Sequence, residues 1–181
     1  MVDFEAIDID SVAVEPDYCH RCGSELGTTE FEGDDYPWCP SCDLVLSRTA
    51  VPAVHVVVHD DDTALVLDEP IPQHEGVWSL PGGHVKPDEG PREAVLRELE
   101  EETGLRAAPD DLRFLTILHA EMPTVAFYFI TYALDRSAVA GELAPEADGF
   151  EATFRALEEI RSSPDRIRES DVERIELAFE T

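Results

Sequence analysis

The chain has 181 residues, of which 43% are apolar and 30% are charged. Its length fits one ordinary domain with a small accessory unit, and its apolar fraction is sufficient for a hydrophobic core, which excludes a wholly disordered chain. No apolar run reaches the roughly 18 residues that a membrane-spanning helix needs, so we predict no membrane partner.

Acidic residues dominate the charge, with 41 Asp and Glu against 13 Lys and Arg for a formal net charge of −28. Hydrophobic periodicity persists along the chain, so this excess is not a simple acidic tail. It resembles the surface of halophilic proteins, where screening by salt makes self-repulsion tolerable. The alternative, a docking surface for a basic partner, is disfavoured because the acid is spread everywhere. Nucleic-acid binding is not expected, since it needs Lys and Arg.

Residues 1–18 are predicted to be an acidic N-terminal lead-in. They contain neither the basic region nor the long apolar stretch of a secretory signal, so we expect a cytoplasmic protein.

All four cysteines lie in two Cys-x-x-Cys pairs separated by sixteen residues: Cys19 and Cys22, then Cys39 and Cys42. Four thiolates at this spacing are typical of a tetrahedral zinc site. Two disulfides are the alternative, which a cytoplasmic setting disfavours. Residues 19–46 therefore read as a zinc ribbon too short for a core of its own. His20 is not expected to be a zinc ligand. The ribbon is expected to have a structural role, since its acidic surface is poorly suited to binding nucleic acid.

The pattern changes from Val51 onwards. VPAVHVVVHD is a nearly continuous β-branched run, which predicts a strand buried on both faces, and TALVLD at 63–68 predicts a second strand. A proline-containing loop at 69–76 and the sequence VWSLP then lead to Gly82-Gly83, where the backbone can approach a ligand closely.

The segment from Gly83 to Leu105 predicts a helix, because Pro91 is tolerated in a first turn and Gly104 suits a C-terminal stop. At 100° per residue its three central acids share one face, and the aliphatic residues lie on the side to be buried. These acids are Glu98, Glu101 and Glu102. Carboxylates without nearby His or Cys suit Mg²⁺ or Mn²⁺, which share their ligand shell with substrate phosphates. The alternative for a run of glutamates alone is a solvated acidic helix face.

This segment also resembles the Nudix box of the Nudix hydrolases, Gly-x5-Glu-x7-Arg-Glu-U-x-Glu-Glu-x-Gly-U, where U is aliphatic. All nine fixed positions over 23 residues match: Gly83, Glu89, Arg97, Glu98, Leu99, Glu101, Glu102, Gly104 and Leu105. The resemblance, which extends over roughly residues 50–160, implies an α/β fold: a Nudix α/β/α sandwich with a mixed β-sheet. We assign residues 50–181 to that domain.

The resemblance also implies roles for the matched residues. Glu98, Glu101 and Glu102 would bind Mg²⁺ or Mn²⁺, and Gly83 would offer its carbonyl oxygen. Arg97, paired with Glu89, would orient this face. The implied activity is metal-dependent hydrolysis of the diphosphate linkage in a nucleoside diphosphate joined to another moiety, such as ADP-ribose or NADH, to give monophosphates. The alternative is a non-catalytic nucleotide-sensing or binding module.

A zinc ribbon before a Nudix box resembles the NADH pyrophosphatases, but the Ser-Gln-Pro-Trp-Pro-Phe motif of that family is absent here, where His119 to Thr124 stand. A further departure is Asp68-Glu69-Pro70, where many relatives carry basic residues after the second strand. The exact substrate is therefore left open. A homodimer is compatible with the sequence.

Two further strands are expected at RFLTILHAE and TVAFYFITYAL, followed by a strand and helix start at FEATFRALEEI. Tyr128 and Tyr132 are expected to pack on the sheet, with stacking on a nucleobase as the alternative. Glu151 is a candidate for an extra metal ligand or general base, with an exposed acid as the alternative. Ser170 and Glu173 match a capping box that would start a C-terminal helix.

Overall fold

The computed structural model describes residues 16–46, 50–68, 76–121, 126–144 and 151–181. The strands are β1 (Gly27–Phe31), β2 (Asp34–Cys39), β3 (Leu44–Val45), β4 (Val51–His59), β5 (Thr63–Asp68), β6 (Trp78–Ser79), β7 (Gly82–His84), β8 (Arg113–Glu121), β9 (Ala126–Asp135) and β10 (Glu151–Ala156). The helices are α1 (Pro91–Thr103), α2 (Leu157–Arg161) and α3 (Glu169–Phe179), with short 3-10 turns η2 (Pro109–Asp111) and η3 (Arg136–Ala138). Among these residues no helix has the length and apolar character needed to cross a membrane.

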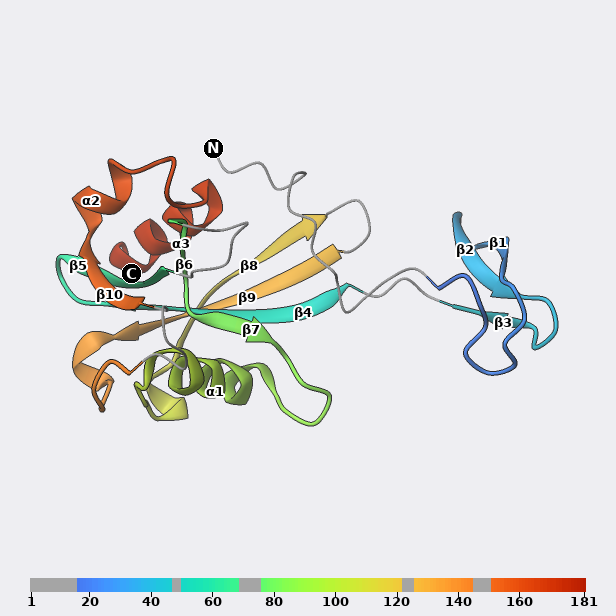
Figure 1. Cartoon of the computed structure of the whole chain (residues 1–181), viewed down its shortest axis with the longest axis horizontal. Coiled ribbons are helices and arrows are strands. Elements are labelled where there is room, and N and C mark those ends of the chain that lie inside the picture. The colour runs from blue at the N-terminus through green and yellow to red at the C-terminus, as the bar shows by residue number, and fades with distance from the viewer. Residues whose placement is uncertain (1–15, 47–49, 69–75, 122–125, 145–150) are drawn as a thin grey trace.

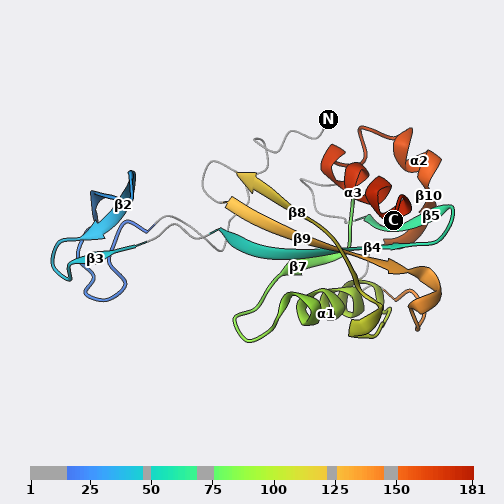
Figure 2. The same ribbon diagram turned by 180° about the vertical axis from the view of Figure 1, so that it is seen from behind.

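A mixed seven-stranded sheet forms the centre of the larger unit. Its strand order is β10-β5-β4-β9-β8, with β6 added to β5 and β7 to β4. The β4–β9 pair is parallel and the other pairs are antiparallel. Helix α1 covers one face of the sheet, while α2 and α3 cover the other (Figure 1), and the view from behind shows the same three layers (Figure 2). The predicted α/β/α sandwich with a mixed sheet is confirmed.

Strand β4 separates two hydrophobic cores. Val54, Val56 and Val58 pack in the cluster that includes the apolar side of α1. Val57 points the other way, into the cluster formed with α2 and α3. Because successive side chains of a strand face opposite sides, a strand buried on both faces must be apolar at nearly every position. This is the reason for the β-branched run in the sequence.

The start of the C-terminal helix differs from the prediction. Helix α3 begins at Glu169, with Arg168 as its N-cap residue and no side-chain cap. Ser170 therefore lies inside the first turn, and the capping-box prediction was wrong. The backbone N–H groups of Asp171 and Val172 bond the carbonyl oxygen of Arg168 instead, and the buried Asp171–Arg174 ion pair holds this turn against the sheet.

A separate antiparallel sheet, β1-β2-β3, follows the first pair of cysteines. In the unit formed by residues 16–46, the only buried residues are Cys19, Pro37 and Cys39. Two of the three are cysteines, so this unit has almost no apolar core apart from its sulfur cluster.

The distribution of ion pairs leads to a prediction about salt. In the described residues at least eight arginines pair with carboxylates, namely Arg97, Arg106, Arg136, Arg155, Arg161, Arg166, Arg168 and Arg174. The chain has 41 acidic but only 13 basic side chains, so most carboxylates cannot each have a basic partner of their own. Screening should relieve their repulsion, so we expect the melting temperature to rise as KCl increases to molar concentration. A melting temperature that falls over this range would contradict the halophilic interpretation.

Candidate active site

The segment that matches the nine-position motif folds as strand, loop and helix. Strand β7 pairs with β4, with Gly82 opposite His55 and Gly83 opposite Val54. Helix α1 has Pro91 at its first position, and it ends at Gly104, whose φ of 76° is in the left-handed region that glycine favours. Both predicted helix ends are confirmed.

Arg97 is the centre of the site. Its Nε and Nη2 donate to the two carboxylate oxygens of Glu89, at 3.0 and 2.6 Å. Its Nη1 donates to Glu98 at 2.7 Å and to Glu101 at 2.9 Å, and its Nη2 also reaches the carbonyl oxygen of His84 at 3.1 Å. One guanidinium group thus joins the strand, the loop and two of the three helix carboxylates.

The same contacts explain the electrostatics of the site. The bonds from Arg97, followed by the backbone N–H of Lys86, lower the pKa of Glu89 to about 2. The carboxylates in turn raise the pKa of Arg97 above its usual range. Both groups are therefore ionised at any pH at which the protein would work, and the contact persists as an ion pair.

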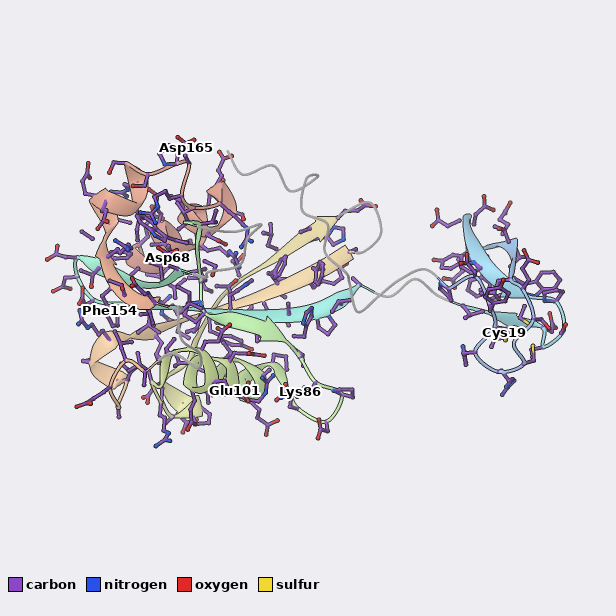
Figure 3. All side chains as sticks on the ribbon, in the orientation of Figure 1. Cys19, Asp68, Lys86, Glu101, Phe154 and Asp165 are labelled. Atoms are coloured by element: carbon purple, nitrogen blue, oxygen red, sulfur yellow. The ribbon has the colours of Figure 1, made fainter. Side chains whose placement is uncertain are left out.

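The third helix carboxylate lies beside the two glycines of β7. The backbone N–H of Gly82 donates to Glu102 Oε2 at 2.8 Å, and a Cβ on Gly83 would lie 2.5 Å from Glu98 Oε1. Glycines thus allow the strand to approach the acidic helix face closely. Figure 3 shows the labelled Glu101 on α1 next to the loop that carries Lys86.

These residues fit a hard divalent cation in donor chemistry, because carboxylates and a nearby peptide carbonyl offer only oxygen. The carboxylate oxygens of these residues do not, however, form a cluster of the kind that a bound cation needs. In the described residues only the cysteine cluster has all its ligand atoms within 4.8 Å of one another. The reason is that Arg97 holds Glu98 and Glu101 while Glu102 bonds the Gly82 amide.

The two glycines give a matched pair of substitutions. A Cβ on Gly82 would overlap the carbonyl oxygen of Val54 and lie 2.9 Å from His55 Cα, so backbone atoms of β4 must move. We expect Gly82→Ala to destabilise the fold, towards the upper end of the roughly 1–3 kcal/mol that overpacking costs. On Gly83 the three atoms nearest to an added Cβ all belong to the carboxylate of the flexible Glu98 side chain, so Gly83→Ala should destabilise the fold much less. Urea unfolding measured on both variants checks this contrast; the opposite ranking would contradict the packing.

Glu151 lies away from this group. It is exposed at the start of β10, where its register partner is Asp68. Ala152 and Phe154 pack against the core on the α1 side, so alternation places Glu151 on the opposite face of the sheet. Its role as a ligand or base remains a prediction.

The four cysteine sulfurs lie within 4.8 Å of one another, and all four cysteines are free. Cys22 Sγ and Cys39 Sγ are 3.5 Å apart. Hydrogen bonding with Ser24 lowers the pKa of Cys22 to about 6, whereas the neighbouring sulfur of Cys22 and burial raise the pKa of Cys42 to about 12. A cluster in which one thiolate opposes the ionisation of the next is suited to a cation that neutralises several thiolates together.

Sequence reasoning missed a buried polar group on the α3 side of the sheet. Arg174 of α3 donates to Thr131 of β9 at 3.1 Å, lies 2.8 Å from Nδ1 of His55 in β4, and forms an ion pair with Asp171. The one signal in the sequence was His55, a polar residue inside an otherwise apolar strand. The partners of His55 lie far along the chain, so no local pattern could identify them.

Comparison with known proteins gives two kinds of similarity. A 56-residue stretch is 45% identical to phosphatase NudJ of Escherichia coli K12, covering 31% of this chain and 36% of that protein. The chain thus spans about a third of the length of the curated relatives it matches. Among solved structures, a MutT NUDIX hydrolase from Burkholderia pseudomallei has a TM-score of 0.61 at 20% identity, covering 72% of this chain and 98% of that one. An ADP compounds hydrolase also has a TM-score of 0.61, at 22% identity, over 86% and 83% of the two chains.

At these identities the solved structures establish the shared fold alone. The family model of the NUDIX domain matches residues 49–177, which include the whole mixed sheet, α1 and nearly all of α3. The chain therefore belongs to the NUDIX domain family.

Proposed function

We propose that this protein is a metal-dependent hydrolase that cleaves the diphosphate linkage of a nucleoside diphosphate joined to another moiety, giving two monophosphates. The observation that carries the proposal is the arrangement around Arg97. This side chain contacts Glu89, Glu98 and Glu101 within 3.0 Å while Glu102 bonds the Gly82 amide. In a merely solvated acidic helix face, there would be no reason for one arginine to bond three carboxylates.

Glu98, Glu101, Glu102 and the carbonyl of Gly83 would hold the Mg²⁺ or Mn²⁺. When bound, such a cation neutralises charge on the diphosphate and lowers the pKa of an attacking water. The Glu89–Arg97 ion pair positions the helix face, because Arg97 also bonds the carbonyl of His84 in β7. Arg97 donates from Nη1 to both Glu98 and Glu101, so one guanidinium nitrogen holds these two carboxylates.

The proton of the attacking water needs an acceptor, and we assign it to one carboxylate of the helix group, with Glu151 as the alternative. Glu98 and Glu102 lie beside β7, whereas Glu151 is on the other sheet face. This placement supports the helix group. Turnover of Glu151→Gln decides between the two: turnover close to that of the wild type would exclude Glu151 as the base, whereas Glu102→Gln should lose turnover in either case because it removes a proposed cation ligand.

The substrate is tested by measuring monophosphate release from ADP-ribose, NADH, dinucleoside polyphosphates and nucleoside triphosphates, with Mg²⁺ or Mn²⁺ at high salt. We expect ADP-ribose- or NADH-like compounds to be cleaved between the two phosphates. If none of these compounds is hydrolysed although the protein binds nucleotides, the binding-module alternative replaces the enzymatic proposal.

We further propose that the four cysteines hold one structural Zn²⁺. The gathered sulfurs and the near absence of other buried residues in the β1-β2-β3 unit support this proposal.

A further inference from the structure

The buried polar group on the α3 side of the sheet is fixed in position by its own hydrogen bonds. Arg174 Nη2 donates to the Asp171 carboxylate, and Nε donates to the carbonyl oxygen of Ser170 at 3.0 Å. Its Nη1 donates to the hydroxyl of Thr131 in β9 at 3.1 Å. Both Thr131 and Asp171 are buried. Since a buried charge is costly to leave unpaired, these contacts hold the guanidinium group in one place in the folded protein.

The same guanidinium group fixes the ring of His55 in β4. Arg174 Nη1 lies 2.8 Å from His55 Nδ1, and because arginine has no acceptor, Nδ1 accepts this bond and Nε2 carries the ring hydrogen. Burial, together with the Arg174 and Arg168 cations, holds the pKa of His55 well below its usual range, so the ring is neutral. The Phe129 ring packs beside it, with 5.0 Å between the ring centres. The imidazole therefore has one tautomer and one orientation.

The fixed ring lies against Gly82 in the neighbouring strand β7. His55 and Gly82 are register partners, and a Cβ added to Gly82 would lie 2.6 Å from Cδ2 of the His55 ring. Paired residues of neighbouring strands face the same side of a sheet, so the imidazole covers the α3 side of this glycine. Because Gly82 has no side chain, the ring packs directly on its backbone.

The backbone N–H of Gly82 serves the candidate active site rather than the sheet. It donates to Glu102 Oε2 at 2.8 Å, so it is not available for the ladder with β4. The bond from the Val56 N–H to the carbonyl oxygen of Pro81 holds the chain just before Gly82. The direction of the Gly82 N–H therefore depends on how its backbone packs against His55.

We propose that His55 and Arg174 are positioning residues of the hydrolytic site, which hold Gly82 from the α3 side of the sheet so that its amide orients Glu102. The proposal rests on the proposed function, which it deepens by assigning a support to one proposed cation ligand. Replacing an outer partner that orients a metal ligand typically lowers metal affinity or activity about 10- to 100-fold. His55 acts through Gly82 and Glu102, so we expect an effect at the lower end of this range.

Three substitutions separate positioning from general stability. His55→Val keeps the β-branched character of β4, but it removes the acceptor for Arg174 and ends short of the Cδ2 position beside Gly82. His55→Asn places its amide oxygen near the position of Nδ1 and its amide nitrogen near that of Cδ2, so it should restore both contacts. Ile175→Val shortens a fully buried side chain of α3 and lowers stability through the apolar core alone.

The first measurement is calorimetric titration with Mn²⁺ in molar KCl, which screens weaker binding to the acidic surface. The dissociation constant of His55→Val should be about tenfold higher than that of the wild type. The constants of His55→Asn and Ile175→Val should stay close to the wild-type value. An unchanged constant in His55→Val, or an equal rise in Ile175→Val, would overturn the proposal.

The second measurement is hydrogen exchange of the Gly82 amide, followed by NMR without metal. The Val85 N–H, which bonds the carbonyl oxygen of Pro52 at 3.1 Å just beyond β7, is the internal reference. In His55→Val the Gly82 amide should exchange about tenfold faster relative to Val85, because its local contact is lost, whereas Ile175→Val should leave this ratio unchanged. The same ratio in His55→Val as in the wild type would contradict the proposal. A wild type that binds no Mn²⁺ would refute the proposed function, and the Gly82 exchange ratio would still decide whether His55 positions the amide.

Discussion

Replacing Glu102 with Gln should lower diphosphate hydrolysis at least about a hundredfold, which corresponds to roughly 2.7 kcal/mol of transition-state stabilisation. The substitution keeps the size of the side chain and its helix propensity but removes one charge from the proposed cation site. The amide oxygen of Gln can still accept the Gly82 N–H bond, which Glu102 accepts at 2.8 Å. The fold should therefore survive, and loss of like-charge repulsion on α1 should stabilise it slightly without metal.

The matched control is Glu100→Gln on the same helix. Glu100 pairs with Arg106 at 2.6 Å, and both side chains are largely exposed, so their contact contributes at most about 1 kcal/mol to stability. Turnover by this variant should stay close to that of the wild type. Equal turnover by wild type, Glu102→Gln and Glu100→Gln would remove the enzymatic interpretation of the segment from Gly83 to Leu105.

The second large effect concerns the cysteines. Purified protein should contain one zinc per chain, and Cys39→Ser should lose it, because Cys39 is fully buried within the sulfur cluster. Since Cys19, Pro37 and Cys39 are the only buried residues at positions 16–46, loss of the metal should unfold β1, β2 and β3 while the mixed sheet remains. Hydrogen exchange of the two units with and without zinc measures this directly.

His20→Ala is the control for the zinc prediction. His20 lies between Cys19 and Cys22 in the first pair and is exposed, so its replacement should leave the zinc content unchanged. Metal analysis that finds no zinc in the wild type, together with two disulfides, would refute the prediction. A change in zinc content in His20→Ala would show that the histidine takes part in the site.

The sequence by itself determined the local features of this protein. Pro91 and Gly104 mark the helix ends because each has a fixed backbone preference that no distant contact has to supply. The β-branched run from Val51 predicted the doubly buried β4, and the cysteine spacing predicted the sulfur cluster. In each case the information lies within a few residues.

Only the tertiary structure decided which residues meet across strands. It placed Glu151 on the sheet face opposite α1 and brought His84 and Phe127 together, although they are 43 positions apart. It also moved the start of α3 to Glu169, where the buried Asp171–Arg174 pair replaces a serine cap. Strand register sets all cross-strand contacts, and register depends on the packing of the whole sheet between two helical layers, which no short window of sequence contains.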